Sequence, residues 1–404
     1  MKANLFSKDI TTDKPLTVTP GEPISEYAAI IGVSDDPRVI DAGRRFSAAI
    51  DDGFVSDFEK SEHQVRLGHA DQPDKMAHVS TFIVIDGYVY MTYYANTKEP
   101  SEDPKNQTAR LVWAPLSDLD NKTYLDVQAS GDSVDGHIID MVYDTILMRR
   151  DENTIYVMWT ARTDGNYYRF IRPFDTRTKQ FGDIKVNRFK VGDVTNDFSS
   201  TGIRSALSAN DIPCKTMYSD IGIMQKLTSR VEDGAPCYYT GAYSGDFNCI
   251  IKSRDLITWE YVSQPDFPNE SKWENAVYVK NDKCYYFVRQ QDSCPYGFLT
   301  AYDLERRTWS KPVAVADCQS RSDFIEYQGR LYLFHAPIDR SHIGIVAVDT
   351  DDLSNSYPLL QAKMSTGCFY PFVQYYQDGE LAMSYTVDRK HIRLARFRLS
   401  DYLG

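Results

Sequence analysis

The sequence repeats one strand–turn–strand pattern along most of its length, and this repetition limits the folds that the chain can adopt. Each copy has two apolar, strand-forming runs joined by a short polar turn such as Asp-Gly. Six copies can be aligned, at residues 78–96, 143–162, 220–243, 274–290, 321–337 and 368–386. Most copies are followed by another strand, so each unit has three or four short antiparallel strands. Units that recur every ~45–80 residues predict an all-β protein, a six-bladed β-propeller.

The last unit lacks an outermost strand, because residues 389–404 supply only its third strand. An early segment in that place would leave no exposed sheet edge. The two candidates are PLTVTP at 15–20 and EHQVRLGH at 62–69. Between them, residues 36–54 have helical spacing and predict a short helix outside the ring.

We therefore treat the chain as one domain with two parts. Residues 1–77 form an N-terminal segment that contains the possible ring-closing strand, and residues 78–404 form the propeller. A five-bladed propeller with an accessory N-terminal segment is the alternative architecture.

Composition argues against several classes of function. Acidic residues outnumber basic ones by 57 to 45, which gives a net charge of −12, and long basic runs are absent. Binding of bulk nucleic acid is therefore not expected. No apolar run approaches the ~18 residues of a transmembrane helix, and the first residues lack the apolar core of a signal peptide. We expect no membrane association and a cytoplasmic chain, or a secreted one if the sequence is a mature form.

Cysteine and histidine spacing predicts neither disulfides nor a metal site. The seven cysteines form no CxxC pair, so free thiols are expected. His63 and His69 lie near aspartates, but their spacing matches no metal-ligand motif. We expect no metal and no other cofactor.

Polar residues occupy corresponding positions in the repeats. In a propeller the innermost strands line the central channel, so the heads of these strands converge on one face. The heads carry six residues, none of them aliphatic: His78, Asp144, Asp220, Glu274, Arg321 and Tyr370. Arginines stand at or just beyond the ends of four second strands: Arg162, Arg289, Arg340 and Arg389. We predict that these side chains share one channel mouth and shift one another's pKa values.

This set of residue types points to chemistry on an anionic substrate. Guanidinium groups form planar clamps for carboxylate, sulfate or phosphate, and carboxylates transfer protons. A tyrosine has a free pKa of about 10, but neighbouring arginines lower it and an adjacent glutamate can accept its proton. A neutral phenol used as the nucleophile also avoids repulsion from an anionic sugar.

The C-terminal half of the chain resembles the exo-sialidase superfamily of six-bladed propeller glycosidases. ENAVYVKNDKCYYFVRQ is similar to the segment in which a glutamate heads one strand and an arginine ends the next, here Glu274 and Arg289. APIDRSHIGI is similar to the next blade, with Arg340 as the third arginine of the carboxylate-binding triad. CFYPFVQYYQDGELAMSY resembles the last blade, with Tyr370 as the nucleophile. KSRDLITWEYV and YDLERRTWSKPV resemble degenerate Asp-box turns.

The resemblance implies an exo-glycosidase that hydrolyses a terminal acidic sugar. The first-blade Arg-Ile-Pro motif of sialidases is absent, and His78 stands in that neighbourhood. Asp140 and Asp144 are the candidates for the acid/base aspartate of the family. The sugar can be sialic-acid-like, a ketodeoxy acid or a uronate.

Two other functions stay open. A polysaccharide lyase would use His78 or Tyr370 as its base and would neutralise a uronate carboxylate with Arg321 or Arg340. A non-catalytic glycan-binding propeller would instead use some of the 28 tyrosines and 19 phenylalanines, although aromatic residues also favour strands. Each function implies an oligosaccharide or glycoside as partner, and for the two enzymes an anionic one.

Overall fold

Strands make up most of the protein in the computed structural model, with 62% of residues in strands and 6% in helices. The structure describes residues 28–30, 62–65, 68–69, 72–214, 221–223, 226–245, 247–265, 271–290, 296–316, 318, 320–336, 340, 342–363 and 368–402. The all-β prediction is confirmed. The predicted strand at 15–20, the predicted helix at 36–54 and Asp220 lie outside the described residues.

The strands form a β-propeller in which five blades are recognised. Five blades is the alternative given above, and the first choice of six stays a prediction. Six sheets with four or more strands are present in the described part of the chain. Compact packing divides the chain into two units, Met1–Glu62 with Pro265–Met383 and Ala395–Gly404, and His63–Gln264 with Ser384–Leu394.

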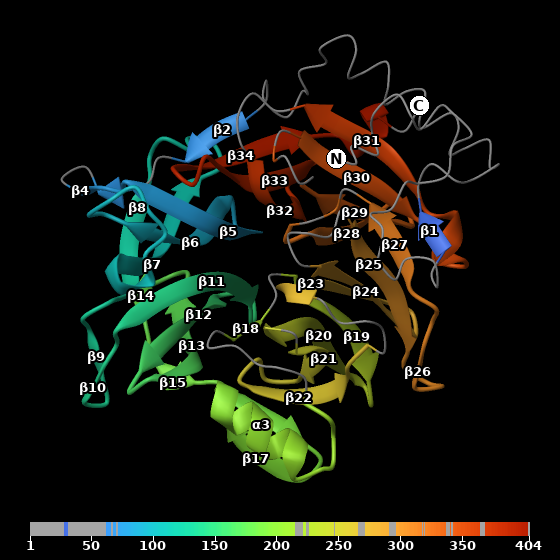
Figure 1. Ribbon diagram of the computed structural model, residues 1–404. Helices are drawn as coiled ribbons and strands as arrows, with labels where there is room; N and C mark the ends of the chain where they lie inside the picture. Colours follow the sequence, from blue (N-terminus) through green and yellow to red (C-terminus); the bar gives the residue numbers. More distant parts are fainter. Residues whose placement is uncertain are drawn as a thin grey trace. The chain divides into compact units, whose positions relative to one another are not determined.

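The unit built from His63–Gln264 and Ser384–Leu394 contains three large sheets (Figure 1). The first has the order β5-β6-β7-β8, with bounds Met76–Ile85, Tyr88–Asn96, Gln107–Pro115 and Thr123–Ala129. The second has the order β11-β12-β13-β14, with bounds Met141–Arg149, Thr154–Thr163, Asn166–Asp175 and Gln180–Phe181. In the second sheet β15 (Lys185–Val186) also pairs with β13.

The third sheet of this unit has the order β17-β16-β22-β21-β20-β18, and β19 also pairs with β20. Its strands are β16 (Arg188–Val191), β17 (Val194–Asp197), β18 (Gly222–Ile223), β19 (Thr228–Glu232), β20 (Ala235–Ser244), β21 (Phe247–Ser253) and β22 (Thr258–Ser263). The smaller elements are β3 (Gly68–His69), β4 (Gln72–Pro73), η3 (Pro104–Asn106), β9 (Ser133–Val134), β10 (His137–Ile138) and α3 (Ser200–Ser208). The Ser199 side chain caps α3 by accepting a hydrogen bond from the Gly202 amide at 3.0 Å.

The other unit contains two large sheets, built mainly from strands within Pro265–Met383. One has the order β1-β27-β25-β24-β23, with bounds Ala28–Ile30, Val313–Ala316, Tyr296–Asp303, Lys283–Gln290 and Ser271–Lys280. In this sheet β26 (Thr308–Trp309) pairs with β25. The next has the order β28-β29-β30-β31, with bounds Asp323–Tyr327, Arg330–His335, His342–Val348 and Tyr357–Lys363. The short helix η4 (Leu353–Asn355) precedes β31.

The last sheet has the order β2-β34-β33-β32, and an early strand lies at its outer edge. Its strands are β2 (Glu62–Val65), β32 (Cys368–Tyr375), β33 (Leu381–Val387) and β34 (His391–Phe397). The helix η5 (Leu399–Tyr402) follows β34. Strand β2 falls within EHQVRLGH, one of the two early segments considered above.

All six predicted hairpins form paired strands, and their turns explain why. At Asp86–Gly87 both residues have positive φ, 47° and 75°, and at Asp378–Gly379 the values are 50° and 76°. Two successive positive φ values are what a type I′ turn requires, and Asp-Gly is a preferred pair for it. These local signals were readable in the sequence.

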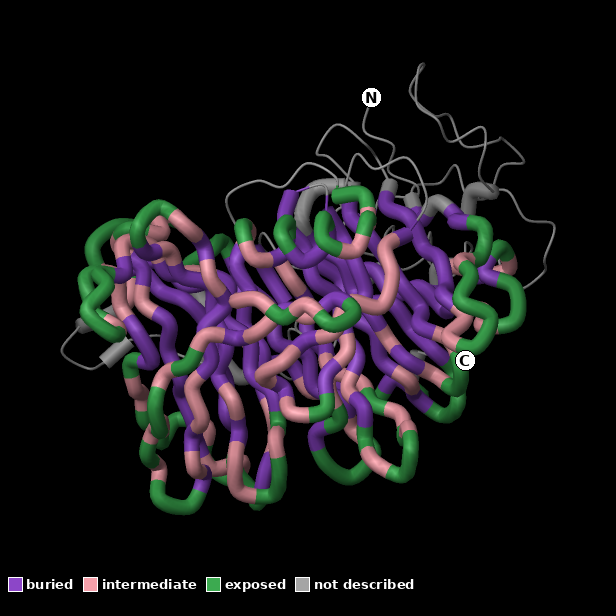
Figure 2. The backbone as a smooth tube through the Cα atoms, turned by 90° about the horizontal axis from the view of Figure 1, so that it is seen from below, coloured by how far each residue is buried: buried purple, intermediate pink, exposed green. Residues whose placement is uncertain are grey.

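Apolar side chains of the first two sheets of the His63–Gln264 unit pack into one cluster. The Trp113 and Phe174 rings, from β7 and β13, lie 5.4 Å apart. The Leu147 amide also donates a hydrogen bond to the Thr81 hydroxyl at 2.8 Å, which joins the inner strands β11 and β5. Buried residues follow the strands, and exposed ones gather at the connecting turns (Figure 2).

Removal of residues 1–70 tests the structural role of the early strands β1 and β2 together. We expect a free energy of unfolding lower by about 2–4 kcal/mol, because a strand of this length contributes several ladder hydrogen bonds of roughly 0.5–1.5 kcal/mol each. Urea denaturation measures this difference. Removal of residues 1–27, which keeps both β1 and β2, is the control and should cost less. An unchanged denaturation midpoint after removal of 1–70 would contradict the prediction.

Candidate functional site

Four of the residues singled out in the sequence lie together in the Pro265–Met383 unit. Glu274 stands on β23, Arg289 near the end of β24, Arg321 just before β28 and Tyr370 on β32. They come from different strands. In an antiparallel pair the start of one strand and the end of its partner lie at the same end of the sheet, which brings such residues together. We refer to these four residues as the Tyr370 cluster.

The Tyr370 cluster is centred on one carboxylate. The Arg289 guanidinium forms an ion pair and a hydrogen bond with Glu274, and the Tyr370 hydroxyl also donates a hydrogen bond to Glu274. The Cζ atom of Arg321 lies 5.2 Å from the centroid of the Tyr370 ring. Glu274, Arg289 and Arg321 are 5%, 6% and 2% exposed, whereas Tyr370 is only half-buried. Tyr370 is therefore the member of the cluster that a ligand reaches most easily.

The environment keeps Glu274 ionised. Burial by itself would raise the pKa of the Glu274 carboxyl, but the charges of Arg289 and Arg321 and the hydrogen bonds from Tyr370 and Arg289 outweigh it. The pKa of Glu274 therefore lies below its usual value. An anionic carboxylate that accepts a hydrogen bond from a phenol is suited to accept the phenol's proton.

The backbone at Tyr370 is unusual. Its φ is 56°, in the left-handed region, and it is the only aromatic residue with positive φ in the described part of the chain. Pro371 follows it, and a proline disfavours the right-handed helical region at the residue before it. The left-handed conformation costs roughly 1–3 kcal/mol and persists only where neighbouring contacts impose it.

Asp323 is one of the contacts that hold the strand of Tyr370. Its carboxylate is fully buried and accepts a hydrogen bond from the Val373 amide at 2.8 Å. Asp323 thereby joins β28 to β32, three residues beyond Tyr370. The sequence analysis missed Asp323, although strand alternation places it on the same side as Arg321, two residues earlier.

Arg340 lies next to the Tyr370 cluster. Its Cζ atom is 5.3 Å from the centroid of the Phe369 ring, and the Phe369 and Tyr370 rings are 6.5 Å apart in an edge-to-face arrangement. Arg340 is half-buried and has a φ of 58°. Phe369 therefore stands in contact with both Arg340 and Tyr370.

The remaining candidates lie in the other unit, and two of them form an ion pair. Arg162 binds both carboxylate oxygens of Asp140, with its Nε at 2.9 and 3.1 Å and its Nη2 at 2.8 Å. The Asp140 side chain is 42% exposed. This fork geometry gives the Asp140–Arg162 pair a definite orientation.

Asp144 is buried and held by two neighbours. Its Oδ2 accepts a hydrogen bond from the Tyr243 hydroxyl at 2.9 Å and lies 3.5 Å from the Arg169 Nη1. Its φ is 54°, so this strand head also has a left-handed residue. Asp144 therefore ties β11 to β13 and β20.

His78 and Arg389 complete the set. The His78 Nδ1 lies 3.0 Å from the Thr386 hydroxyl, and the His78 ring is fully buried. Arg389 forms an ion pair with Glu102 at 2.7 Å. Asp220 lies outside the described residues, so it has no place in this description.

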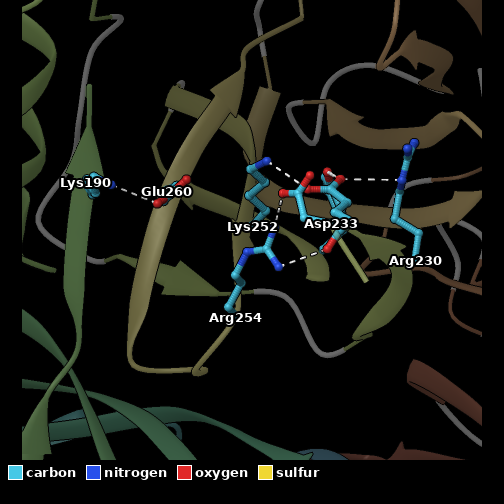
Figure 3. Close-up of polar contacts among 8 residues, drawn as sticks. Lys190, Arg230, Asp233, Lys252, Arg254 and Glu260 are labelled. Atoms are coloured by element: carbon cyan, nitrogen blue, oxygen red, sulfur yellow. Dashed lines mark hydrogen bonds and ion pairs between the residues drawn. The ribbon is translucent and has the colours of Figure 1, made fainter. Parts of the chain in front are cut away.

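A second charged cluster, which the sequence analysis did not single out, lies on the third sheet of the His63–Gln264 unit (Figure 3). Glu232 accepts from Lys252 at 3.1 Å and pairs with Arg230 at 3.4 Å, and Asp233 pairs with Arg254 at 2.9 Å. These charges satisfy one another and are partly open to water, where such pairs contribute little. We assign them a structural role.

Neither a metal centre nor a membrane span is found where the structure is described. No group of three or more His, Cys, Asp or Glu side chains there has metal-binding geometry. None of the helices in that part of the chain is long and apolar enough to cross a membrane.

Comparison with known proteins shows the fold and not the family. No family model matches the sequence, and no curated protein matches it. The structure is similar to the Hadza microbial sialidase Hz136, with 12% identity, TM-score 0.59 and coverage of 84% of this chain and 69% of that one. NanB sialidase from Streptococcus pneumoniae has 8% identity, TM-score 0.55 and coverages of 84% and 71%. A protein of unknown function from Dyadobacter fermentans has 12% identity, TM-score 0.54 and coverages of 83% and 98%.

The Glu274→Gln variant tests the electrostatics of the cluster. At neutral pH we expect it to lower the free energy of unfolding by about 3 kcal/mol, because two buried arginines lose their anionic neighbour. A lowered folded-state pKa stabilises the fold above the unfolded pKa of about 4.3, and this contribution is lost as the pH falls through the folded-state pKa. The difference in free energy of unfolding between wild type and variant should therefore become smaller below about pH 4.

Chemical denaturation over a pH series measures this narrowing. Glu326→Gln is the control, since Glu326 forms a partly exposed pair with Lys280 at 3.0 Å and should cost less than about 1 kcal/mol. If the difference in free energy of unfolding between wild type and Glu274→Gln stays constant or grows on acidification, Glu274 does not stabilise the fold through its charge.

Proposed function

We propose that this chain is an exo-glycosidase that hydrolyses a terminal acidic sugar. The observation that carries the proposal is the hydrogen bond from the Tyr370 hydroxyl to an ionised, buried Glu274, with the Arg321 guanidinium beside the Tyr370 ring. A phenol in this setting has both a proton acceptor and a nearby positive charge that favours its anion.

In the proposed reaction Tyr370 is the nucleophile. Its oxygen attacks the anomeric carbon while Glu274 accepts the phenolic proton, and the glycosidic bond breaks with protonation of the leaving oxygen. Water then attacks the anomeric carbon and gives one proton back to the acid group, and the bond to Tyr370 breaks as the proton on Glu274 returns to the phenol oxygen. The overall reaction consumes one water molecule and leaves the residue unchanged.

The leaving oxygen needs an acid beyond these two residues. Asp140 and Asp144 stay the candidates, and His78 stays a candidate base for the lyase alternative. Asp140 is half-exposed, whereas Asp144 is buried and already accepts a hydrogen bond from Tyr243.

We propose different roles for the arginines in binding the substrate carboxylate. Arg289 is buried and paired with Glu274, so its main effect is to hold that carboxylate in place. Arg340 is half-buried beside Phe369, and Arg321 lies against Tyr370. We therefore assign the direct contact with the substrate to the half-buried Arg340. Arg321 is as buried as Arg289, so we propose that it acts as a fixed charge beside Tyr370. We propose no substrate contact for Arg162 and Arg389, which pair with Asp140 and Glu102.

Two similar structures carry the name sialidase, which supports a carbohydrate substrate. A sialic-acid-like sugar, a ketodeoxy acid and a uronate each present a carboxylate to the arginines. The experiments below separate hydrolysis from the lyase and binding alternatives.

Tyr370→Phe removes the phenolic hydroxyl that is the proposed nucleophile and keeps the aromatic ring. We expect normal folding and a loss of turnover of at least about 10³-fold on a panel of sialosides, ketodeoxy-acid glycosides and uronides. Tyr375→Phe is the matched control, because Tyr375 stands on the same strand and its hydroxyl donates to the Glu326 carbonyl at 2.6 Å. It should keep full activity.

The products of the same panel, extended to uronate polysaccharides, decide between the alternatives. A product with ultraviolet absorbance from a new double bond would identify a lyase. Binding without turnover would identify a glycan-binding propeller. Full activity of Tyr370→Phe would overturn the assignment of the nucleophile.

Arg340→Lys tests the clamp. An ammonium cannot reproduce the two parallel hydrogen bonds of a guanidinium, so kcat/KM on an acidic glycoside should fall by about 10- to 100-fold. Arg330→Lys, an exposed change in the same unit, is the control and should have little effect. Equal kinetics of wild type and Arg340→Lys would show that Arg340 does not bind the carboxylate.

A further inference from the structure

Two turns of similar sequence hold their tryptophans differently. In KSRDLITW, Asp255 accepts hydrogen bonds from the amides of Ile257 and Thr258 at 2.8 and 2.7 Å, and Trp259 is fully buried. In YDLERRTW, Asp303 accepts hydrogen bonds from the amides of residues 305 and 306 at 3.0 and 2.8 Å in the same way, but Trp309 is only half-buried. The second turn is two residues longer between its aspartate and its tryptophan, and only its tryptophan is partly exposed.

Trp309 lines a pocket in the Pro265–Met383 unit. The pocket has a volume of about 440 Å³, within the ~300–1,000 Å³ that is typical of ligand sites. Its wall includes Tyr285 from β24 and Leu353 from η4, which are both buried. We call it the Trp309 pocket.

The indole is held in a fixed position before any ligand arrives. Its ring lies 5.1 Å from the Tyr302 ring and 5.5 Å from the Tyr286 ring, measured between centroids. Packing of this kind restricts the side-chain rotamers, so little entropy is lost when a ligand stacks on the ring. A rigid aromatic face suits a flat apolar surface.

The rim of the Trp309 pocket carries both positively and negatively charged side chains. Lys283, Lys311 and Asp351 line it. Among the described residues, the side chains of these three make no hydrogen bond or ion pair with the protein, whereas Asp303 is engaged within its own turn. A rim with ammonium donors and a carboxylate acceptor favours a neutral ligand that both donates and accepts hydrogen bonds.

The Trp309 pocket is separate from the Tyr370 cluster. Lys283 and Arg289 stand near opposite ends of β24, six positions apart. At about 3.3 Å per residue this separation is roughly 20 Å. A ligand in the pocket therefore does not contact the reacting atoms of the proposed reaction.

We propose that the Trp309 pocket binds a neutral oligosaccharide. A pyranose ring has one face of C–H groups, which stacks on the Trp309 indole, and hydroxyl groups at its edge, which bond to Lys283, Lys311 and Asp351. The proposal does not rest on the proposed hydrolysis of an acidic sugar, because it concerns other residues and a ligand without a carboxylate.

The test is calorimetric titration of the full chain with cellohexaose, maltohexaose, chitohexaose and mannohexaose. We expect at least one of them to bind with a dissociation constant of about 0.1–10 mM, and Trp309→Ala to weaken that binding about tenfold or more. Trp309→Phe keeps an aromatic face and should retain most of the affinity. Lys311→Met and Asp351→Asn should each weaken binding. Both positions are exposed, so these variants should fold even if Trp309→Ala does not.

Three results would overturn the proposal. They are the absence of binding by every hexasaccharide up to about 10 mM, unchanged affinity in Trp309→Ala together with Asp351→Asn, and loss of binding in Tyr370→Phe but not in Trp309→Ala. Turnover of an acidic glycoside by Trp309→Ala should equal that of wild type. Calorimetry thus tests oligosaccharide binding in the Trp309 pocket, and turnover separately tests the proposed hydrolysis.

Discussion

Buried carboxylates near the heads of the inner strands are the constraint on which much of this structure depends. A buried carboxylate destabilises the fold by several kcal/mol unless hydrogen-bond donors or cations surround it. Glu274 meets this need with Arg289 and Tyr370, Asp144 with Tyr243 and Arg169, and Asp323 with the Val373 amide. Each carboxylate therefore specifies which neighbouring strand lies beside it and in what register.

The same constraint underlies the proposed chemistry. The arginines that make burial of Glu274 tolerable also keep it ionised, and an ionised Glu274 can hold the Tyr370 hydroxyl as a proton acceptor does. Asp323 holds the strand on which Tyr370 adopts its left-handed φ. The energy of that backbone conformation is supplied by contacts elsewhere, which is the usual condition for strain at a functional site.

The two Asp-box-like turns show how one local motif serves two purposes. Both turns are closed by an aspartate that accepts hydrogen bonds from the amides two and three residues later. Trp259 packs into the core of its unit, whereas Trp309 keeps part of its ring open in a pocket. The turns also differ in length, since Trp259 stands four residues after Asp255 and Trp309 six residues after Asp303.

The sequence by itself determined the hairpins, because alternating apolar residues and Asp-Gly turns act over a few neighbouring residues. It also singled out Glu274, Arg289, Arg321 and Tyr370, since strand heads and strand ends fall at a fixed distance from each turn. Only the tertiary structure decided the partners. Asp144 meets Tyr243 across 99 residues and Asp323 meets Val373 across 50, and no local pattern encodes such pairs. The direction of the Glu274 pKa shift depends on Arg321 and Tyr370, which other strands bring to it, and no pattern near Tyr370 predicts its left-handed φ.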